Sequence, residues 1–332
     1  MSLSYRSFAE QTRHYFTRPH RGLPGAPVAS PAAWLGSQQR QRENEWLIHL
    51  TPVQIDALAH AAEQAMAAGV SQAALTAAEF EIEPLLPLLK DCRRELASGR
   101  GFVVLRGLPV AQWGDELAAY VYWGIGHHLG VPGAQNPANE LLGHVVDYGE
   151  EAAQPSVRRY RTSGNIDFHC DAADVVGLLC LRTARSGGQS RIASSVSLFN
   201  ALFEQQPALV PRLFEAFYLD RRDEQPAGAA PYSQLQPCCW DGTTLRTFYH
   251  SEYFRSASRL AEVTIDSAAQ QVLDGYDALA ASPEHHLDMW LEPGDMQFIS
   301  NHTTIHARTA YEDWPDPARR RHLLRLWLSL PV

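Results

Sequence analysis

Residues 292–309 read EPGDMQFISNHTTIHART, and residues 320–327 read RRHLLRLW. A turn, a β-prone run, a histidine and, after a Pro- and Asp-rich loop, an arginine on a second β-prone run follow one another in that order. The order is more specific than any of its parts. Two β-prone runs and the loop between them would thus carry an imidazole that can ligate a metal and a guanidinium that can hold a carboxylate by a bidentate ion pair.

A second candidate for metal binding lies earlier, at Phe168-His169-Cys170-Asp171. Residues two apart on a strand point to the same face, so His169 and Asp171 can grip one metal ion, whereas Cys170 points away. Alone, such a pair arises easily by chance in a chain with 14 histidines. With a histidine from residues 292–309 it would give two imidazoles and one carboxylate, the facial set that leaves open positions on non-haem Fe(II).

Composition narrows the class of protein. The chain has 332 residues, of which 45% are hydrophobic and 20% charged, as in an ordinary globular protein. Its net charge of −9 lacks the broad basic footprint of a nucleic-acid binder. Five cysteines, two of them adjacent, do not form a disulfide framework. With no apolar leader and no run of about 18 apolar residues, we expect a cytoplasmic protein outside the membrane.

The chain changes character near residue 101. Before it, residues 18–36 are typical of an extended arm, and helices are expected at 43–69, where Thr51 and Pro52 form a capping pattern, and at 71–98. After it, helices are expected at 115–129, 196–218 and 264–281. Strands are expected at 101–107, 143–147, 175–181, 190–194, 245–249, 289–291, 296–299 and 322–328. Many short strands favour a barrel or jelly roll over a parallel sheet, with a generic α+β fold as the alternative.

Taken together, four segments resemble the taurine dioxygenase (TauD/TfdA) family over roughly residues 100–330. They are residues 169–171, residues 186–190 (SGGQS), the 294–295 turn with residues 305–308, and residues 320–325. The resemblance implies an α+β protein with a mainly-β core, a double-stranded β-helix (jelly roll, cupin-like) with flanking helices. It also implies a division into residues 1–98, an N-terminal arm and helical segment packed on the core, and residues 99–332, the catalytic domain.

The same resemblance implies roles for individual residues. His169, Asp171 and His306 match the iron ligands of the family. His302 competes for the third place, but His306 is followed at the second position by an arginine, as in the family. Arg321 matches the arginine that pairs with the far carboxylate of 2-oxoglutarate.

Further positions match the family's cosubstrate and substrate contacts. Ser190 matches a hydroxyl that hydrogen-bonds the cosubstrate carboxylate, although a plain turn residue is the alternative. Arg325 matches a position near the cosubstrate or a substrate anion, and Asn165 one that often lines the pocket. Arg320 is expected on the surface.

The activity implied by the resemblance is oxidation of an unactivated C–H bond by Fe(II), 2-oxoglutarate and O2, with release of succinate and CO2. Related halogenases have a small residue at the position of Asp171, so a carboxylate there favours hydroxylation, desaturation or another oxidation. The expected partner is a small molecule, with an anionic or amino-acid-like compound as one candidate class, and the oligomeric state is left open. The alternatives are a non-catalytic jelly roll that binds a metal or small molecule, and an iron enzyme without 2-oxoglutarate.

Specificity is expected from loops, here residues 131–165 and 220–245. His250 and Glu252 form another pair two residues apart, next to Tyr249 and Tyr253. Core packing is the expected role of these two tyrosines, with a place in the pocket wall as the alternative.

Overall fold

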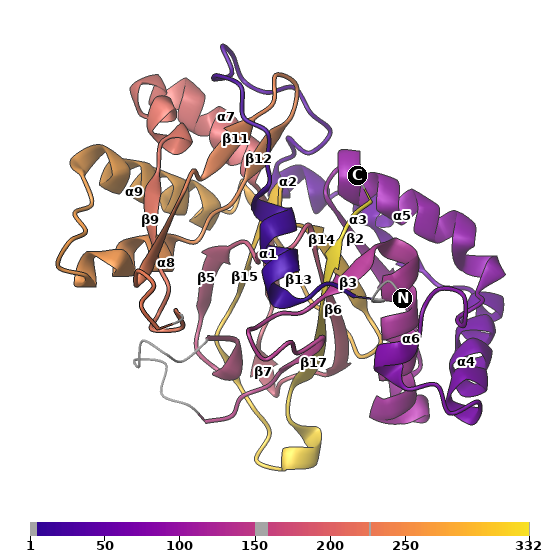
Figure 1. Ribbon diagram of the computed structural model, residues 1–332. Helices are drawn as coiled ribbons and strands as arrows, with labels where there is room; N and C mark the ends of the chain where they lie inside the picture. Colours follow the sequence, from indigo (N-terminus) through magenta and orange to yellow (C-terminus); the bar gives the residue numbers. More distant parts are fainter. Residues whose placement is uncertain (1–4, 150–158, 226, 332) are drawn as a thin grey trace.

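The structure, a computed structural model, describes residues 5–149, 159–225 and 227–331. Two β-sheets form its centre, with helices on both outer surfaces (Figure 1). Within those residues the larger sheet has the order β1-β2-β14-β6-β17-β3, with β4 also paired to β17, and the smaller has the order β13-β8-β15-β5. The strands of the larger sheet are β1 Leu47–His49, β2 Phe102–Arg106, β3 Val131–Gly133, β4 Leu142–Val145, β6 Val175–Arg182, β14 Met296–Ser300 and β17 His322–Ser329. Those of the smaller are β5 Ile166–His169, β8 Ser190–Ser194, β13 His286–Met289 and β15 Thr304–Arg308.

Helices pack on the outer face of each sheet (Figure 1). The larger sheet is covered by α4 Pro52–Ala67, α5 Leu86–Ser98 and α6 Val110–Leu129. The smaller is covered by α7 Ser195–Gln205 and α9 Ser267–Ala281. The remaining helices are α1 Phe8–Phe16, α2 Gly36–Gln39, α3 Glu43–Trp46 and α8 Ser251–Ser256. None of the described helices has the length and apolar character needed to cross a bilayer.

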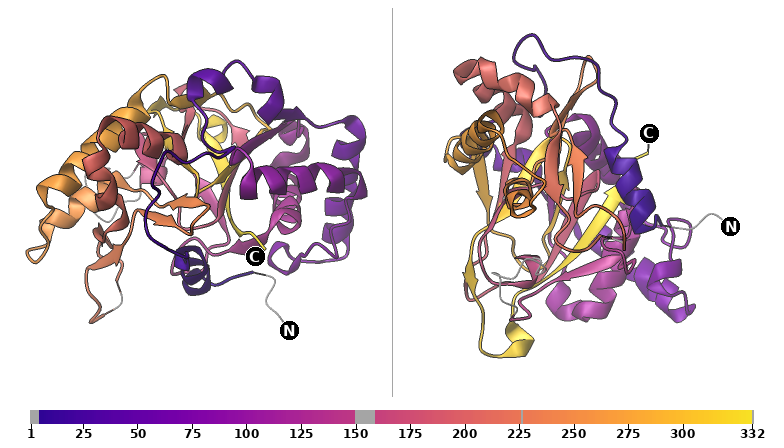
Figure 2. Two further views of the ribbon diagram at one scale, coloured as in Figure 1. Left: turned by 90° about the horizontal axis from the view of Figure 1, so that it is seen from above. Right: turned by 60° about the vertical axis from the view of Figure 1, so that its left-hand side comes forward.

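Three short two-stranded antiparallel sheets complete the described part of the fold. They pair β9 Phe217–Asp220 with β10 Tyr232–Leu235, β11 Cys238–Trp240 with β12 Leu245–Thr247, and β7 Ser186–Gly187 with β16 Tyr311–Glu312. Helix α1 lies against the C-terminal end of β17, where the Ser329 hydroxyl donates to Gln11 (Figure 2). The five cysteines are all free and buried.

Alternation along the strands produces this layering. On β2, Val103 and Leu105 belong to the core beneath α4, α5 and α6. Phe102 and Val104 point the other way, into the core between the two sheets. A strand buried on both faces has apolar side chains at every position rather than at every second one, which is why residues 102–105 read Phe-Val-Val-Leu. The jelly-roll prediction is confirmed.

Several predicted elements are confirmed, including the strand at 101–107 and the helices at 115–129 and 264–281, but two helices were predicted too long. Residues 47–49 interrupt the helix expected at 43–69, because they pair in parallel with the edge of β2 before Thr51 caps α4. At 71–98 the α-helix begins only at Leu86, after two short 3-10 turns. The division at residue 98 stays a prediction. The segment before it contributes β1 to the larger sheet.

Two further expectations were wrong in their bounds. The helix expected at 196–218 ends at Gln205, and a 3-10 segment, Pro207–Phe214, precedes β9. Pro207 and Pro211 explain the break, because proline has no N–H to donate to an α-helix. The strand expected at 289–291 lies earlier, as β13, where it pairs with β8, and after Met289 the chain leaves the sheet.

The turn before β14 ties the larger sheet together. The carboxylate of Asp295, which is fully buried, accepts hydrogen bonds from Arg106 Nε at 2.8 Å and Nη2 at 2.7 Å. Gly294 precedes it with φ +93°, and a Cβ at this position would collide with the Leu108 carbonyl oxygen. The turn therefore requires glycine for its conformation and for its close approach to the chain after β2.

We predict that Gly294→Ala destabilises the protein more than Gly242→Ala does. Both glycines have positive φ, which costs a side chain about 1–3 kcal/mol, but an added Cβ at Gly242 has nothing within 4 Å. The collision at Gly294 adds about 1 kcal/mol or more. Urea denaturation of the two variants measures the difference in the free energy of unfolding. Equal losses would mean that the close approach to Leu108 has no energetic consequence.

Candidate metal centre and substrate pocket

Strand alternation brings the candidate metal ligands into the space between the sheets. Cys170, Ile305 and Ala307 belong to the outer core beneath α7 and α9. Because side chains alternate along a strand, the residues next to them in the chain, His169, Asp171 and His306, point inward. His169 and His306 are register partners on β5 and β15, and their ring centroids lie 4.2 Å apart. Two imidazoles from distant parts of the chain therefore meet on the inner face of the smaller sheet.

Asp171 completes a cluster of three metal-binding side chains. Its Oδ1 lies 4.0 Å from His169 Nε2, and its Oδ2 lies 4.0 Å from His306 Nε2. One potential ligand atom from each of the three side chains lies within 4.8 Å of the others. The spacing is wide enough for one ion to bind all three atoms.

The carboxylate of Asp171 is held from the opposite side. Trp327 Nε1 on β17 donates a hydrogen bond to Oδ2 at 3.0 Å, and Arg325 Nη1 lies 3.5 Å from the same oxygen. The backbone N–H of Asp171 donates to Asn301 Oδ1 at 3.1 Å, and the Asn301 amide donates to the Ala173 carbonyl at 2.9 Å. These contacts orient the acidic group independently of any metal.

The protonation states suit a divalent metal. Burial opposes ionisation of Asp171, but Arg325 and the nearby His306 outweigh it and lower its pKa to about 2. Burial, reinforced by His169, lowers the pKa of His306 to about 3. At neutral pH the cluster thus offers an ionised carboxylate and a neutral imidazole of His306.

The donor set fits Fe(II). His169 Nδ1 lies 2.9 Å from the carbonyl oxygen of Asp167, which places the proton on Nδ1 and leaves the Nε2 lone pair for a metal. Two imidazoles and one carboxylate with open positions are the facial triad of non-haem iron oxygenases. His169, Asp171 and His306 are thus the residues that would hold the ion.

His302, the alternative ligand, lies elsewhere. It sits in the turn between β14 and β15, where its Nε2 is 2.8 Å from Asp174 Oδ1 and its ring stacks on Tyr15 at 4.7 Å. This ring contacts the N-terminal helix rather than the three-residue cluster.

Two buried arginines share one corner of the fold. Among the described residues, neither Arg321 nor Arg308 forms an ion pair, and burial lowers the pKa of both guanidinium groups, that of Arg308 to about 10. The guanidinium carbon of Arg321 lies 5.0 Å from the ring centroid of Tyr311, and that of Arg308 lies 4.7 Å from it. Arg321 Nη1 is buried without a hydrogen-bond partner in the part of the chain that is described. Such a pair of buried cations favours binding of an anion.

The other predicted contact residues differ in position. Arg325 lines the pocket beside Asp171. Ser190 is the Cα register partner of Arg308, and its hydroxyl donates to Gln297 Oε1 at 2.8 Å. Asn165 is exposed and donates to Asp167 Oδ1, and it is not among the lining residues. Arg320 is exposed, as expected.

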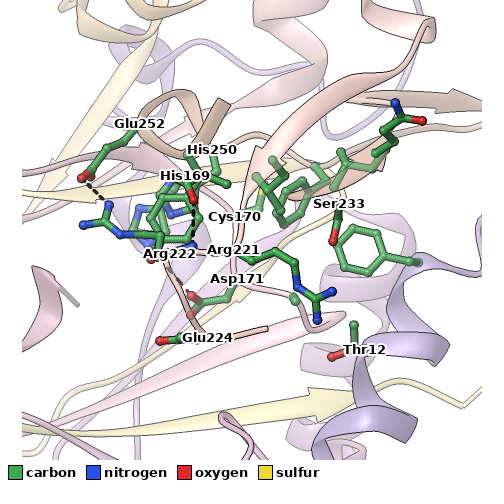
Figure 3. Close-up of a pocket in the computed structure, with 18 of the residues that line it drawn as sticks. Thr12, His169, Cys170, Asp171, Arg221, Arg222, Glu224, Ser233, His250 and Glu252 are labelled. Atoms are coloured by element: carbon green, nitrogen blue, oxygen red, sulfur yellow. Dashed lines mark hydrogen bonds and ion pairs between the residues drawn. The ribbon is translucent and has the colours of Figure 1, made fainter. Parts of the chain in front are cut away.

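A cavity of about 830 Å³ opens beside the cluster (Figure 3). His169, Asp171 and Arg325 lie in its wall. The loops expected to carry specificity also line it, mainly through residues 220–222, 224, 233–236 and 239 and, from the earlier loop, Pro137 and Tyr160. Residues 150–158 of that loop lie outside the described residues. The volume is typical of a small-molecule site.

The aromatic segment after β12 divides between pocket and core. His250, Glu252 and Tyr253 line the cavity, and the rings of His250 and Tyr253 stack at 3.7 Å. Tyr249 is buried and donates to Asp277 Oδ1 at 2.6 Å. The expectation of core packing is therefore confirmed for Tyr249 and wrong for Tyr253.

Sequence reasoning missed several groups around the site. Trp327, Asn301 and Arg308 act through contacts between distant strands, and Phe8, Thr12 and Phe16 reach the pocket from an unpredicted helix. For Trp327, alternation carried along β17 from Arg325 was an available signal. The others had no comparable local signal.

We predict that His306→Gln weakens Co(II) binding by more than about 100-fold, since even residues that only support a metal ligand typically contribute about 10–100-fold. The matched control is His302→Gln, which removes a histidine four residues away that lies outside the cluster. It should change the affinity less than about tenfold. Anaerobic titration followed by the visible absorption of Co(II) measures both affinities, and circular dichroism confirms folding. Tighter binding by His306→Gln than by His302→Gln would move the third ligand to His302.

Comparison with known proteins places the chain in a family. Residues 67–327 match the family described as "Taurine catabolism dioxygenase TauD, TfdA family". FR-33289 synthase from Streptomyces rubellomurinus (strain ATCC 31215) is 30% identical over 315 residues, covering 92% of this chain and 91% of the relative. Taurine hydroxylase-like protein SAT17 from Stachybotrys chartarum (strain CBS 109288 / IBT 7711) is 24% identical over 327 residues, covering 96% and 82%.

Solved structures share the fold. An asparagine oxygenase in complex with Fe(II), 2S,3S-3-hydroxyasparagine and succinate has a TM-score of 0.67 at 19% identity, covering 86% of this chain and 93% of its own. The non-heme iron oxygenase OrfP with Fe and alpha-ketoglutaric acid has a TM-score of 0.64 at 17% identity, covering 86% and 94%. The family match over 67–327 and the 30% identity with FR-33289 synthase over 92% of this chain show that this chain belongs to the TauD/TfdA family of Fe(II)- and 2-oxoglutarate-dependent dioxygenases.

Proposed function

We propose that this dioxygenase hydroxylates or desaturates an unactivated C–H bond of a small anionic, amino-acid-like molecule. The observation that carries the proposal is the cluster of His169, Asp171 and His306 within 4.8 Å, beside a cavity of about 830 Å³. When bound, Fe(II) supplies the activation of O2 that is coupled to conversion of 2-oxoglutarate to succinate and CO2.

The protein's own contribution is to fix the donors and to limit access of water. Trp327 donates to the Asp171 carboxylate and Asn301 accepts from the Asp171 backbone N–H, so the protein itself orients this residue. The side chains of Asp171 and His306 are buried, which limits their contact with water. A site with fixed and largely buried donors favours one reaction over leakage of the oxidant.

Arg321 is the proposed anchor for the far carboxylate of 2-oxoglutarate. Its support is a buried guanidinium without an ion pair among the described residues, next to Gly188 and facing Tyr311. A Cβ at position 188 would lie 3.1 Å from Arg321 Nε, so glycine there leaves the guanidinium room. The Ser190 hydroxyl now donates to Gln297 Oε1. It can assist only if it donates to the cosubstrate carboxylate instead, for instance after the Gln297 amide rotates.

The proposed class of substrate rests on charge and on the relatives. Arg325 presents a cation to the pocket beside Asp171, although its Nε donates to Gln135 Oε1 at 2.7 Å. The asparagine oxygenase and the taurine hydroxylase-like relative are named for an amino acid and an amino sulfonate, which supports a small molecule with a carboxylate or similar anion. Asn165 would contact a substrate only if its loop moved toward the pocket.

We predict that Arg321→Gln raises the 2-oxoglutarate concentration needed for half-saturation by roughly 100-fold, since removing one partner of a desolvated ion pair commonly costs a few kcal/mol. The matched control, Arg320→Gln, removes an exposed arginine one position away and should have little effect. Calorimetry with Co(II)-loaded protein measures cosubstrate binding without turnover. Unchanged binding by Arg321→Gln, with Co(II) affinity retained, would place the cosubstrate carboxylate elsewhere.

The reaction itself is tested by screening small carboxylates, amino acids and other anions with Fe(II), 2-oxoglutarate and O2. We expect one of them to yield a product heavier by one oxygen atom or lighter by two hydrogen atoms, together with an equimolar amount of succinate. Mass spectrometry identifies the product, and Asp171→Ala serves as the inactive control. Products formed only from uncharged compounds would contradict the proposed anionic class.

A further inference from the structure

The turn that joins β9 to the following loop has an unusual backbone. Arg222 and Asp223 have φ of 54° and 65°, and Glu224 N donates to the Arg221 carbonyl at 3.0 Å. Two successive left-handed residues are typical of a type I′ turn, where Asn and Gly are normally preferred. Arginine and aspartate at these positions are strained, so surrounding contacts must hold the turn.

Ion pairs supply those contacts. Arg259 donates to Asp220 Oδ2 at 2.7 Å and to Asp223 Oδ1 at 2.8 Å. Arg222 Nη1 donates to Glu252 Oε1 at 2.8 Å, and its guanidinium lies over the Tyr253 ring at 4.9 Å. The charged side chains on both sides of position 221 are thereby committed to the scaffold.

Arg221 differs from its neighbours. Its backbone N–H donates to the Pro231 carbonyl, but its half-buried side chain has no hydrogen bond or ion pair within the described part of the chain. It lines the cavity, and in Figure 3 its guanidinium extends into the cavity toward Thr12. Glu224 also lines the cavity but has a partner of its own. The turn thus directs one uncommitted cation into the pocket.

Helix α1 forms the facing wall. Phe8, Thr12 and Phe16 recur at intervals of four residues and line the cavity, whereas Gln11 and Tyr15 are buried against the body of the protein. Tyr15 donates to the Asn301 carbonyl at 2.9 Å, so the helix is fixed close to the residue that orients Asp171. The Thr12 hydroxyl oxygen is buried without a partner among the described residues.

We propose that Arg221, with Thr12 as a second donor, binds an oxyanion group of the substrate. This inference rests on the proposed function and adds the residues that recognise the anion. A planar guanidinium suits carboxylate, sulfonate and phosphate groups alike, because each presents two oxygens to its paired N–H groups. The subsite uses α1, which lies outside the family match at residues 67–327.

The other arginines of the pocket are committed to different contacts. Arg325 donates to Gln135 and lies 3.5 Å from Asp171. Arg18 donates through Nη2 to the Gln236 carbonyl, and its guanidinium packs over Tyr15 and Phe16, while its Nε and Nη1 have no hydrogen-bond partner among the described residues. Arg221 therefore differs from both in that its side chain has no hydrogen bond to the scaffold within the described residues, so its whole guanidinium is available to a ligand.

Binding of simple anions to the metal-free protein tests the subsite. Acetate, methanesulfonate and inorganic phosphate are titrated by calorimetry at constant ionic strength into the wild type, Arg221→Gln, Arg221→Lys and Thr12→Val. We expect Arg221→Gln to weaken the best-bound anion by about tenfold, Arg221→Lys to retain part of the affinity, and Thr12→Val to lose about threefold. The anion that binds best identifies the group on the substrate.

Two controls separate this inference from the proposed function. Arg13→Gln removes one positive charge from an exposed position on α1 and should leave anion binding unchanged. Binding of 2-oxoglutarate to the Co(II)-loaded protein should be unaffected by Arg221→Gln, since it depends on Arg321. Equal anion affinity in the wild type and Arg221→Gln, or no measurable binding by the wild type, would overturn the subsite. Unchanged affinity in Thr12→Val would remove Thr12 from it. Failure of 2-oxoglutarate to bind would instead overturn the proposed function.

Discussion

The buried carboxylate of Asp171 is the group on which the site depends. An ionised acid removed from water is costly unless charges and hydrogen bonds replace its hydration. Here the Trp327 indole and the Arg325 guanidinium supply part of that replacement, and two imidazoles lie on the other side. The remaining coordination capacity of the carboxylate faces the imidazoles, where a divalent cation would complete the compensation.

Strand alternation makes this arrangement possible in an otherwise apolar interior. Each strand of the smaller sheet gives one face to the helices and the other to the space between the sheets, so His169 and His306 point inward while their neighbours build the outer core. The opposite wall comes from β17, which turns Arg325 and Trp327 toward the same space. The polar centre therefore requires both sheets, and neither could hold Asp171 in this way alone.

Much of the fold and of the metal cluster could be predicted from the sequence, because local patterns indicated the strands and the first two ligands and the family resemblance supplied the rest. Spacing by two placed His169 and Asp171 on one face, whereas the choice of His306 and Arg321 came from the resemblance to the TauD/TfdA family. The pairing of residues 47–49 with β2, and the placing of α1 against β17, depend on edges and surfaces far away in the sequence. Pairing of residues 47–49 with the edge of β2 thus overrides the helical pattern at 43–69.

The pocket was less predictable for the same reason. Arg221 looks like its neighbour Arg222 in sequence, but in the described residues the side chain of Arg222 contacts Glu252 and Tyr253, whereas that of Arg221 extends into the cavity. Likewise, Tyr249 and Tyr253 are both aromatic residues of one segment, yet Tyr249 is buried in the core, where its hydroxyl donates to Asp277. Whether a side chain is committed to the scaffold or available to a ligand is a property of the assembled fold.

The most direct test of this account is an anomalous difference map, recorded at the iron absorption edge, from crystals equilibrated anaerobically with Fe(II). The account predicts one dominant peak, ligated by Nε2 of His169, Nε2 of His306 and a carboxylate oxygen of Asp171. A dominant peak ligated by other side chains, such as His302 with Asp174, would contradict it.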